Sequence, residues 1–348
     1  MHPLAVAYQN AVHDLPDALR VRTALEDEVA KALTGGDHAL IRGFWRIGKT
    51  ELCKAALKKA CERTGGAAFY IDLRDPEQED GLPKTQDSVL ARLKAKVDTF
   101  IERVGAGSLK ADPKHPLLAL GELAAPIFVG IDEAIALKAL GQPAMSSMLD
   151  DLLQTPKNVK LCLVCHRHRE ADELFESLSA RPHTQTFFVP NITDEELAHL
   201  VRTPAREHGV TVNDELLAAI NQVSGRRPWE VFVLCHLITR GLDDGFKGEL
   251  KSDLIDPWLS VDALTEVEEG QAVVDNVLRV FTTAMNENEQ AVVTLLATGA
   301  EGEVPEDALE SLQKSAYLEN KDGFALLGSL FEGLARAVAE GEIRVRVE

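Results

Sequence analysis

The sequence predicts an α/β fold in which a parallel sheet is covered by helices on both faces and is followed by a helical region. Near-continuous apolar runs of strand length alternate with segments of helical period as far as about residue 190, and from Thr193 onward the pattern is helical. A glycine-bearing stretch, residues 43–50, lies between the first strand and a helix. Ligands of such sheets bind at the carboxyl ends of the strands, so we expect the functional site there.

The elements of the first half follow from apolar spacing and from turn residues. Gly35 and Gly36 end the first helix, and the segments 75–84 and 105–116 are loops because they combine Gly, Pro and charged residues without a period. The predicted strands are 39–41, 67–73, 126–132, 159–165 and 186–189, and the predicted helices are 12–33, 50–64, 88–104, 117–124 and 145–153.

The second half begins with a capping signature at Thr193, which predicts a helix to about residue 206. Further helices begin at Asn213 and, after Gly225, at Pro228. The Gly- and Asp-rich residues 241–248 mark a boundary. Three helices at 273–284, 287–297 and 306–317 and a short strand at 323–327 then fit a winged helix-turn-helix, although residues 330–338 equally suit another helix. We therefore predict domains at 1–190, 191–245 and 246–348.

The stretch from Gly43 to Thr50 matches the pattern G-x-x-x-x-G-K-S/T of a phosphate-binding loop. Its glycines let backbone N–H groups face the phosphates, Lys49 reaches the terminal phosphates, and the Thr50 hydroxyl can ligate Mg²⁺. The predicted nucleotide-binding residues of this segment are Gly43, Phe44, Trp45, Arg46, Ile47, Gly48, Lys49, Thr50 and Glu51.

A second motif is the apolar run from Pro126 that ends in Asp132 and Glu133. An acidic pair at the end of a buried strand places the first carboxylate beside the metal and the second near the γ-phosphate, where it orients and deprotonates water. We therefore predict Thr50 and Asp132 as the Mg²⁺ ligands and Glu133 as a catalytic residue.

Composition bounds the function. The chain has 348 residues, 45% of them hydrophobic, and a formal net charge of −19. No apolar run approaches the roughly 20 residues that cross a bilayer, and the N-terminus lacks the pattern of a signal peptide, so we expect a cytoplasmic protein without a membrane partner. The five cysteines are expected to be free thiols. The acidic surface disfavours nucleic acid without excluding a local basic face.

Residues 15–240 together resemble the signal-transduction NTPases of the STAND group and the related archaeal-type ATPases, a branch of the AAA+ P-loop NTPases. The segment 42–50 looks like that group's Walker A motif, and 128–133 looks like its Walker B motif. Residues 163–167 are similar to its fourth strand, which implies that Arg167 senses the γ-phosphate. Residues 223–229 resemble the Gly-x-x-Pro signature of the helical lid, which implies nucleotide contacts for Gly225 and Pro228.

The resemblance implies a P-loop NTPase core, a helical lid and a winged-helix-like C-terminal domain. It also implies an ATPase of low turnover: a switch that uses ATP and Mg²⁺ and couples nucleotide state to assembly as a homo-oligomer or to a protein partner. The alternatives are an ATP-dependent DNA-binding loader or transposition-type regulator, and a scaffold in which ATP is structural. Residues 246–348 carry eight Lys and Arg against 21 Asp and Glu, a balance of −13 that disfavours DNA.

Several residues permit two interpretations. Trp45 either packs on the lid or linker or contacts a neighbouring subunit, and Arg46 forms either a surface salt bridge or an interdomain contact. His166 and His168 are either polar residues at the sheet edge or functional groups near the phosphates. Arg226 and Arg227 are candidates for a second sensor in the lid.

Overall fold

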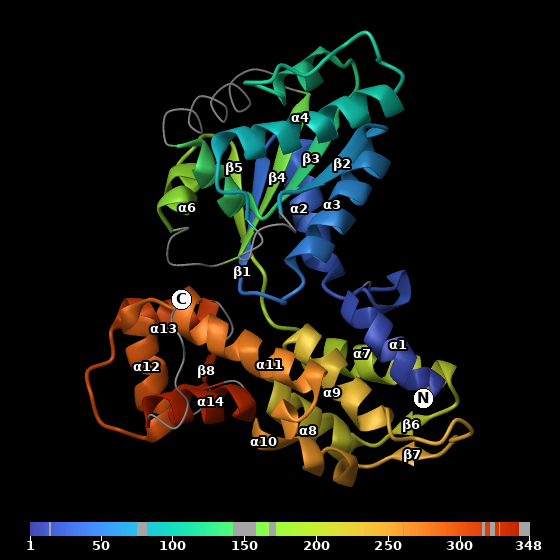
Figure 1. Ribbon diagram of the computed structural model, residues 1–348, viewed down its shortest axis with the longest axis vertical. Helices are drawn as coiled ribbons and strands as arrows, with labels where there is room; N and C mark the ends of the chain where they lie inside the picture. The colour runs from blue at the N-terminus through green and yellow to red at the C-terminus, as the bar shows by residue number, and fades with distance from the viewer. Residues whose placement is uncertain are drawn as a thin grey trace. The chain divides into compact units, whose positions relative to one another are not determined.

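The computed structural model describes residues 1–13, 15–74, 82–141, 158–166, 172–259, 261–314, 317–320, 324–326 and 328–340, which form two compact units (Figure 1). The α/β unit comprises Thr23–Gly43 and Lys49–Phe188. The helical unit comprises Met1–Arg22, Phe44–Gly48 and Val189–Glu348. Two segments that precede residue 190 in sequence thus belong to the helical unit, and one of them is the middle of the phosphate-binding loop.

The sheet of the α/β unit has five parallel strands in the order β2-β3-β4-β1-β5. These strands are β1 (His38–Gly43), β2 (Ala67–Asp72), β3 (Ile127–Asp132), β4 (Val159–His166) and β5 (Thr184–Phe188). The parallel sheet confirms the predicted α/β fold class. Because β4 lies between β1 and β3, the strand that enters the phosphate-binding loop and the strand that carries the acidic pair both neighbour β4.

Helices cover both faces of this sheet, as predicted. Helix α3 (Lys49–Thr64) packs closely on one face at Gly130, where an added Cβ would lie 2.7 Å from Leu57 and 2.9 Å from the Cys53 sulfur. A larger residue at Gly130 would push α3 off the strand. On the other face, α4 (Gln86–Arg103) contributes Val89 and Leu93 to a core shared with Leu40, Val129 and Leu161.

Several elements of the α/β unit differ from the predicted ones. Residues 117–124 form a 3₁₀ turn at Leu118–Glu122, and a second turn, Ala134–Leu140, follows the acidic pair. Helix α6 (Asp172–Ser179) precedes β5. The helix predicted at residues 145–153 lies outside the described residues.

The single helix predicted over residues 12–33 is wrong, since two helices occupy this part of the chain. Helix α1 (Pro3–His13) is followed by a 3₁₀ turn at Asp17–Leu19 and by α2 (Thr23–Gly35). Two backbone features break the helical path: Pro16 precedes the turn in an extended conformation, and Arg22 has a φ of 65°. Apolar spacing alone does not reveal such breaks.

After β5 the helical unit contains the three helices that the sequence predicts. They are α7 (Asp194–Glu207), α8 (Asp214–Ser224) and α9 (Pro228–Thr239). Thr193 and Glu196 form the expected capping box, and Gly225 ends α8 with a φ of 57°. Two short strands that were not predicted, β6 (Thr211–Val212) and β7 (Glu249–Leu250), pair in parallel.

The C-terminal part of this unit contains α10 (Val261–Thr265), α11 (Glu268–Arg279), which continues into a short π-helix at Val280–Ala284, α12 (Glu287–Thr298) and α13 (Glu306–Lys314). The antiparallel pair β8 (Leu318–Asn320) and β9 (Phe324–Leu326) follows, and then α14 (Ser329–Ala339). The predicted strand and the alternative helix are therefore both present. No helix in the described ranges is long and apolar enough to cross a membrane.

Candidate nucleotide-binding site

The phosphate-binding loop leaves the sheet at Gly43 and enters α3 at Lys49. Gly43 lies opposite His166 of β4 in the strand register. Lys49, the first residue of α3, is buried, with 8% of the residue exposed. The loop thus joins a buried strand to a helix N-terminus, which is the context that phosphate binding requires.

Two loop residues adopt left-handed backbone conformations. Arg46 has a φ of 61° and Gly48 a φ of 94°. Alternation between right- and left-handed residues turns successive backbone N–H groups toward one side and forms a concave anion site. The left-handed backbone at Gly48 disfavours any residue with a side chain. In addition, a Cβ at this position would lie 2.9 Å from the Arg22 guanidinium.

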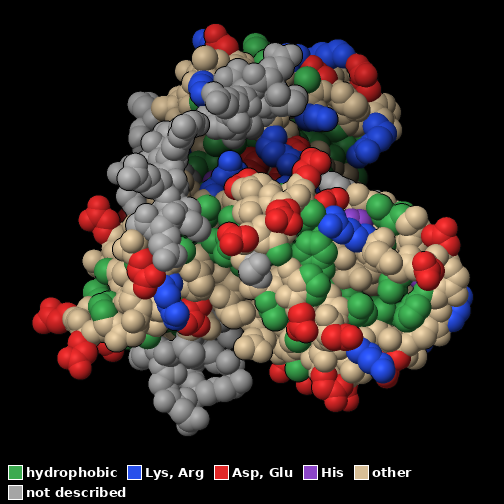
Figure 2. All heavy atoms as spheres, turned by 60° about the horizontal axis from the view of Figure 1, so that its bottom comes forward, with side chains coloured by type: hydrophobic (Ala, Val, Ile, Leu, Met, Phe, Trp, Pro, Cys, Tyr) green, Lys and Arg blue, Asp and Glu red, His purple; other side chains and the backbone are tan. Residues whose placement is uncertain are grey.

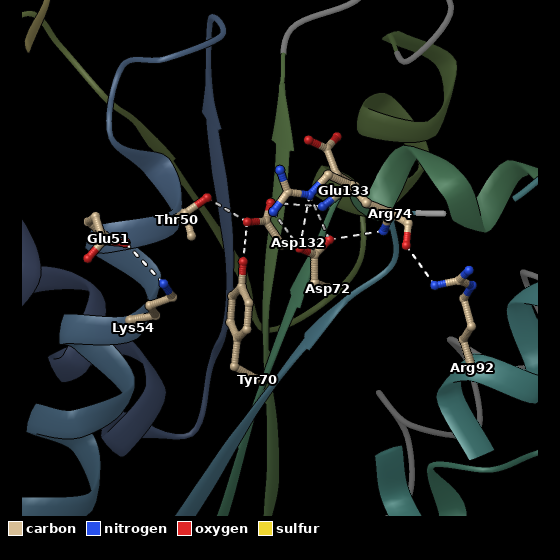
Figure 3. A network of polar contacts seen from close by, with 9 residues as sticks. All are labelled: Thr50, Glu51, Lys54, Tyr70, Asp72, Arg74, Arg92, Asp132 and Glu133. Carbon is tan, nitrogen blue, oxygen red and sulfur yellow. Dashed lines mark hydrogen bonds and ion pairs between the residues drawn. The ribbon is translucent and has the colours of Figure 1, made fainter. Parts of the chain in front are cut away.

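Asp132, at the end of β3, connects α3 to the neighbouring strand β2 (Figure 3). Its Oδ2 accepts hydrogen bonds from the Thr50 hydroxyl at 2.6 Å and from the Tyr70 hydroxyl, and its Oδ1 accepts from the Glu133 N–H at 2.8 Å. Burial and the Asp132 carboxylate raise the pKa of Tyr70, so its hydroxyl stays a donor. Three donors thereby fix the carboxylate.

Glu133 directly follows β3 in a left-handed conformation, with a φ of 50°. Its Oε2 lies 2.8 Å from Nδ1 of His166, the last residue of β4. Burial raises the pKa of Glu133, but the hydrogen bond and charge of His166, together with Lys49 and Arg74, outweigh burial and hold it below its ordinary value. Glu133 is therefore a carboxylate that can accept a proton from water.

A cation that the sequence analysis missed lies at the same edge of the sheet. Asp72 ends β2 beside Asp132 in the register, and its Oδ2 accepts from Arg74 at 2.9 Å and 2.6 Å (Figure 3). Hydrogen bonds to Asp72 raise the pKa of Arg74 despite its partial burial. The ion pair with Asp72 holds the Arg74 guanidinium close enough to Glu133 to lower the pKa of that carboxyl group.

The remaining predicted residues lie as follows. Glu51 pairs with Lys54 on α3 at 3.1 Å. Gly225 ends α8, and Pro228 begins α9. In the helical unit, the Arg46 guanidinium lies 5.1 Å from the ring centroid of Trp229, the residue that follows Pro228. The loop residue Arg46 thus lies beside the start of α9. Arg167 and His168 lie outside the described residues.

The residues present fit a magnesium ion. Mg²⁺ prefers hard oxygen ligands and is commonly held by one or two protein groups together with phosphate oxygens and water. Thr50 and Asp132 bring a hydroxyl and a carboxylate together, and the Thr50 oxygen keeps lone pairs for a metal when it donates its hydrogen. Within the described residues no cluster of three or more His, Cys, Asp or Glu side chains could hold a metal ion.

The chain resembles solved structures of other proteins over most of its length. A Walker-type ATPase of Pyrococcus abyssi matches with a TM-score of 0.58 and 17% identity, over 91% of this chain and 95% of that chain. The Orc1 protein of Aeropyrum pernix, in complex with DNA, matches with a TM-score of 0.51 and 15% identity, over 94% and 96%. No protein-family model and no curated protein matches the sequence. The similarity shows a fold shared over nearly the whole chain, that of the P-loop NTPases.

Proposed function

We propose that the protein is a slow ATPase that acts as a molecular switch, coupling its nucleotide state to assembly or to the binding of a protein partner. The observation that carries the ATPase part is the connection between the two motifs, in which Thr50 donates to Asp132 at 2.6 Å and Glu133 directly follows that aspartate. Resemblance to the STAND group supports adenine as the base and the switch as the role.

The side chains of the α/β unit have separate tasks in this proposal. The loop N–H groups and Lys49 bind the phosphates, and Arg74 adds positive charge at the same edge. Bound Mg²⁺ would neutralise phosphate charge at Thr50 and Asp132. Glu133 orients a water molecule and takes its proton, while His166 holds the Glu133 carboxylate in place. Most of the rate enhancement then comes from positioning and electrostatics.

The switch is tested by comparing ATP with ADP. We expect light scattering to report a change in assembly, or hydrogen exchange to report a change across α9, with ATP and not with ADP. Lys49→Ala should bind ATP about 10- to 100-fold more weakly, because a charged hydrogen bond to phosphate is lost. At an ATP concentration that just saturates the parent protein, this variant should show neither change. Lys58→Ala, at an exposed position of the same helix, is the control.

Two results would contradict these assignments. Parental ATP affinity in folded Lys49→Ala would remove the phosphate-binding role of the loop. Identical responses of the parent protein to ATP and ADP would remove the switch and support the scaffold alternative, in which ATP is structural.

The DNA-binding alternative predicts a different result. Carboxylate side chains are spread over the face of the helical unit seen in Figure 2, with scattered Lys and Arg, in keeping with the −13 balance of residues 246–348. We therefore expect the whole protein to bind duplex DNA no more tightly than about 10⁻⁴ M near physiological salt. A band shift at low micromolar protein that weakens as salt is raised would support the loader instead.

A further inference from the structure

The middle of the phosphate-binding loop is held by side chains of the helical unit. Phe44 is 2% exposed, and its ring meets the ring of Tyr317 edge to face, with 4.5 Å between centroids and an interplanar angle of 74°. Tyr317 in turn contacts Phe331 of α14 at 4.7 Å. We call Phe44, Tyr317 and Phe331 the aromatic trio. One member comes from the loop and two come from the C-terminal part of the chain.

The next three loop residues have partners in three other segments of this unit. The Arg279 guanidinium of α11 lies 5.7 Å from the ring centroid of Trp45, and Arg46 lies over Trp229 of α9. The Ile47 carbonyl accepts from Arg22 at 2.6 Å, and the same guanidinium donates to the Pro190 carbonyl at 2.6 Å. Four consecutive residues are therefore each held by a different segment.

Phosphate binding itself does not require these side chains. In a loop of this pattern the backbone N–H groups, the lysine and the hydroxyl bind the phosphates, and the four intervening positions accept any residue. A buried phenylalanine at the first of them is explained by packing. The loop already has left-handed residues at positions 46 and 48 while these contacts are made. The loop therefore has a backbone shape suited to anions while it makes these contacts. This favours the interpretation that the contacts hold the loop ready for phosphate and do not block it.

We propose that Tyr317 is a positioning residue for nucleotide binding: the C-terminal part of the chain, through the aromatic trio, holds the phosphate-binding loop in its anion-binding shape. Linkage is reciprocal, so a bound nucleotide stabilises the attachment of the C-terminal part to the loop, and detachment weakens nucleotide binding. This regulation rests on the proposed nucleotide binding and deepens it. Because the contact involves the loop and not the γ-phosphate, it acts on ATP and ADP alike.

Calorimetric titration of the whole protein with ADP and with ATP tests the proposal. Tyr317→Ala and Phe44→Leu should each weaken both nucleotides by about two- to tenfold, the equivalent of one aromatic pair. The double variant should be no weaker than the worse single variant, because both remove the same contact. Tyr317→Phe, which retains the ring, should restore most of the affinity.

A matched control separates this role from general destabilisation. Trp258→Ala removes another ring of the helical unit, which stacks with Arg240 at 4.8 Å, and should leave nucleotide affinity unchanged. In the parent protein, ADP should also slow hydrogen exchange across α14.

The outcomes distinguish this inference from the proposed function. Parental affinities in folded Tyr317→Ala and Phe44→Leu would overturn the inference alone. Absence of nucleotide binding in the parent protein would overturn both. Tighter binding by the two variants would show that the trio obstructs the loop, and would equally overturn the inference.

Discussion

Replacing Glu133 by glutamine should lower the rate of ATP hydrolysis by about 100-fold or more while ATP and Mg²⁺ remain bound. The amide keeps the size of the side chain but cannot take a proton from water, and loss of a positioned general base typically costs that much. The phosphates contact Lys49 and the loop in our proposal, so binding should stay within a few-fold of the parent protein. The variant should therefore accumulate the ATP-bound form.

Phosphate release at saturating ATP and Mg²⁺ measures this effect, and calorimetry confirms that ATP is bound. Glu62→Gln is the matched control because it makes the same chemical change at an exposed position of α3. A Glu133→Gln rate equal to that of the parent would assign the water to another group.

The two candidate motifs can be found in the sequence because each is a local pattern. The spacing of Gly43, Gly48 and Lys49 and the acidic end of β3 define them without any tertiary information. The partners of these motifs could not be predicted in the same way. Tyr70 and His166 reach Asp132 and Glu133 only because β2 and β4 flank β3, and the order of strands in a sheet does not follow from their order in the chain.

The fold was predicted best where periodic patterns are long. The sheet and α7 to α9 have clear periods or caps, whereas β6 and β7 are two residues each and have no period to detect. The break near Arg22 arises from backbone conformation and from a tertiary anchor, since its N–H donates to Glu196 at 2.7 Å. Burial lowers the pKa of the Arg22 guanidinium to about 10, and Glu196 opposes that shift.

A buried ion pair lies beside the aromatic trio in the helical unit. Arg227 donates to Glu230 from Nε at 2.7 Å and from Nη2 at 2.8 Å, and the two residues are 4% and 1% exposed. The guanidinium also lies 5.4 Å from the ring centroid of Tyr317 and 5.7 Å from that of Phe331. Arg227 is thus committed to the packing of this unit in the structure, which argues against its role as a second sensor.

Glu230→Gln should lower the free energy of unfolding of the helical unit by about 3–5 kcal/mol, because the Arg227 charge stays buried without its counter-charge. Denaturant unfolding followed by tryptophan fluorescence suits the measurement, since all three tryptophans, Trp45, Trp229 and Trp258, belong to the helical unit. The signal therefore reports this unit even when the α/β unit unfolds separately.

Glu332→Gln provides the matched comparison for Glu230→Gln. It makes the same change in a pair with Arg336 at 2.8 Å whose side chains are 39% and 49% exposed, and such a pair is worth about 0–1 kcal/mol. A similarly small loss for Glu230→Gln would mean that the Glu230 charge is not needed beside Arg227. A large loss accompanied by weaker ADP binding would show that the pair also supports Tyr317 against the loop, because the guanidinium contacts the same ring that contacts Phe44.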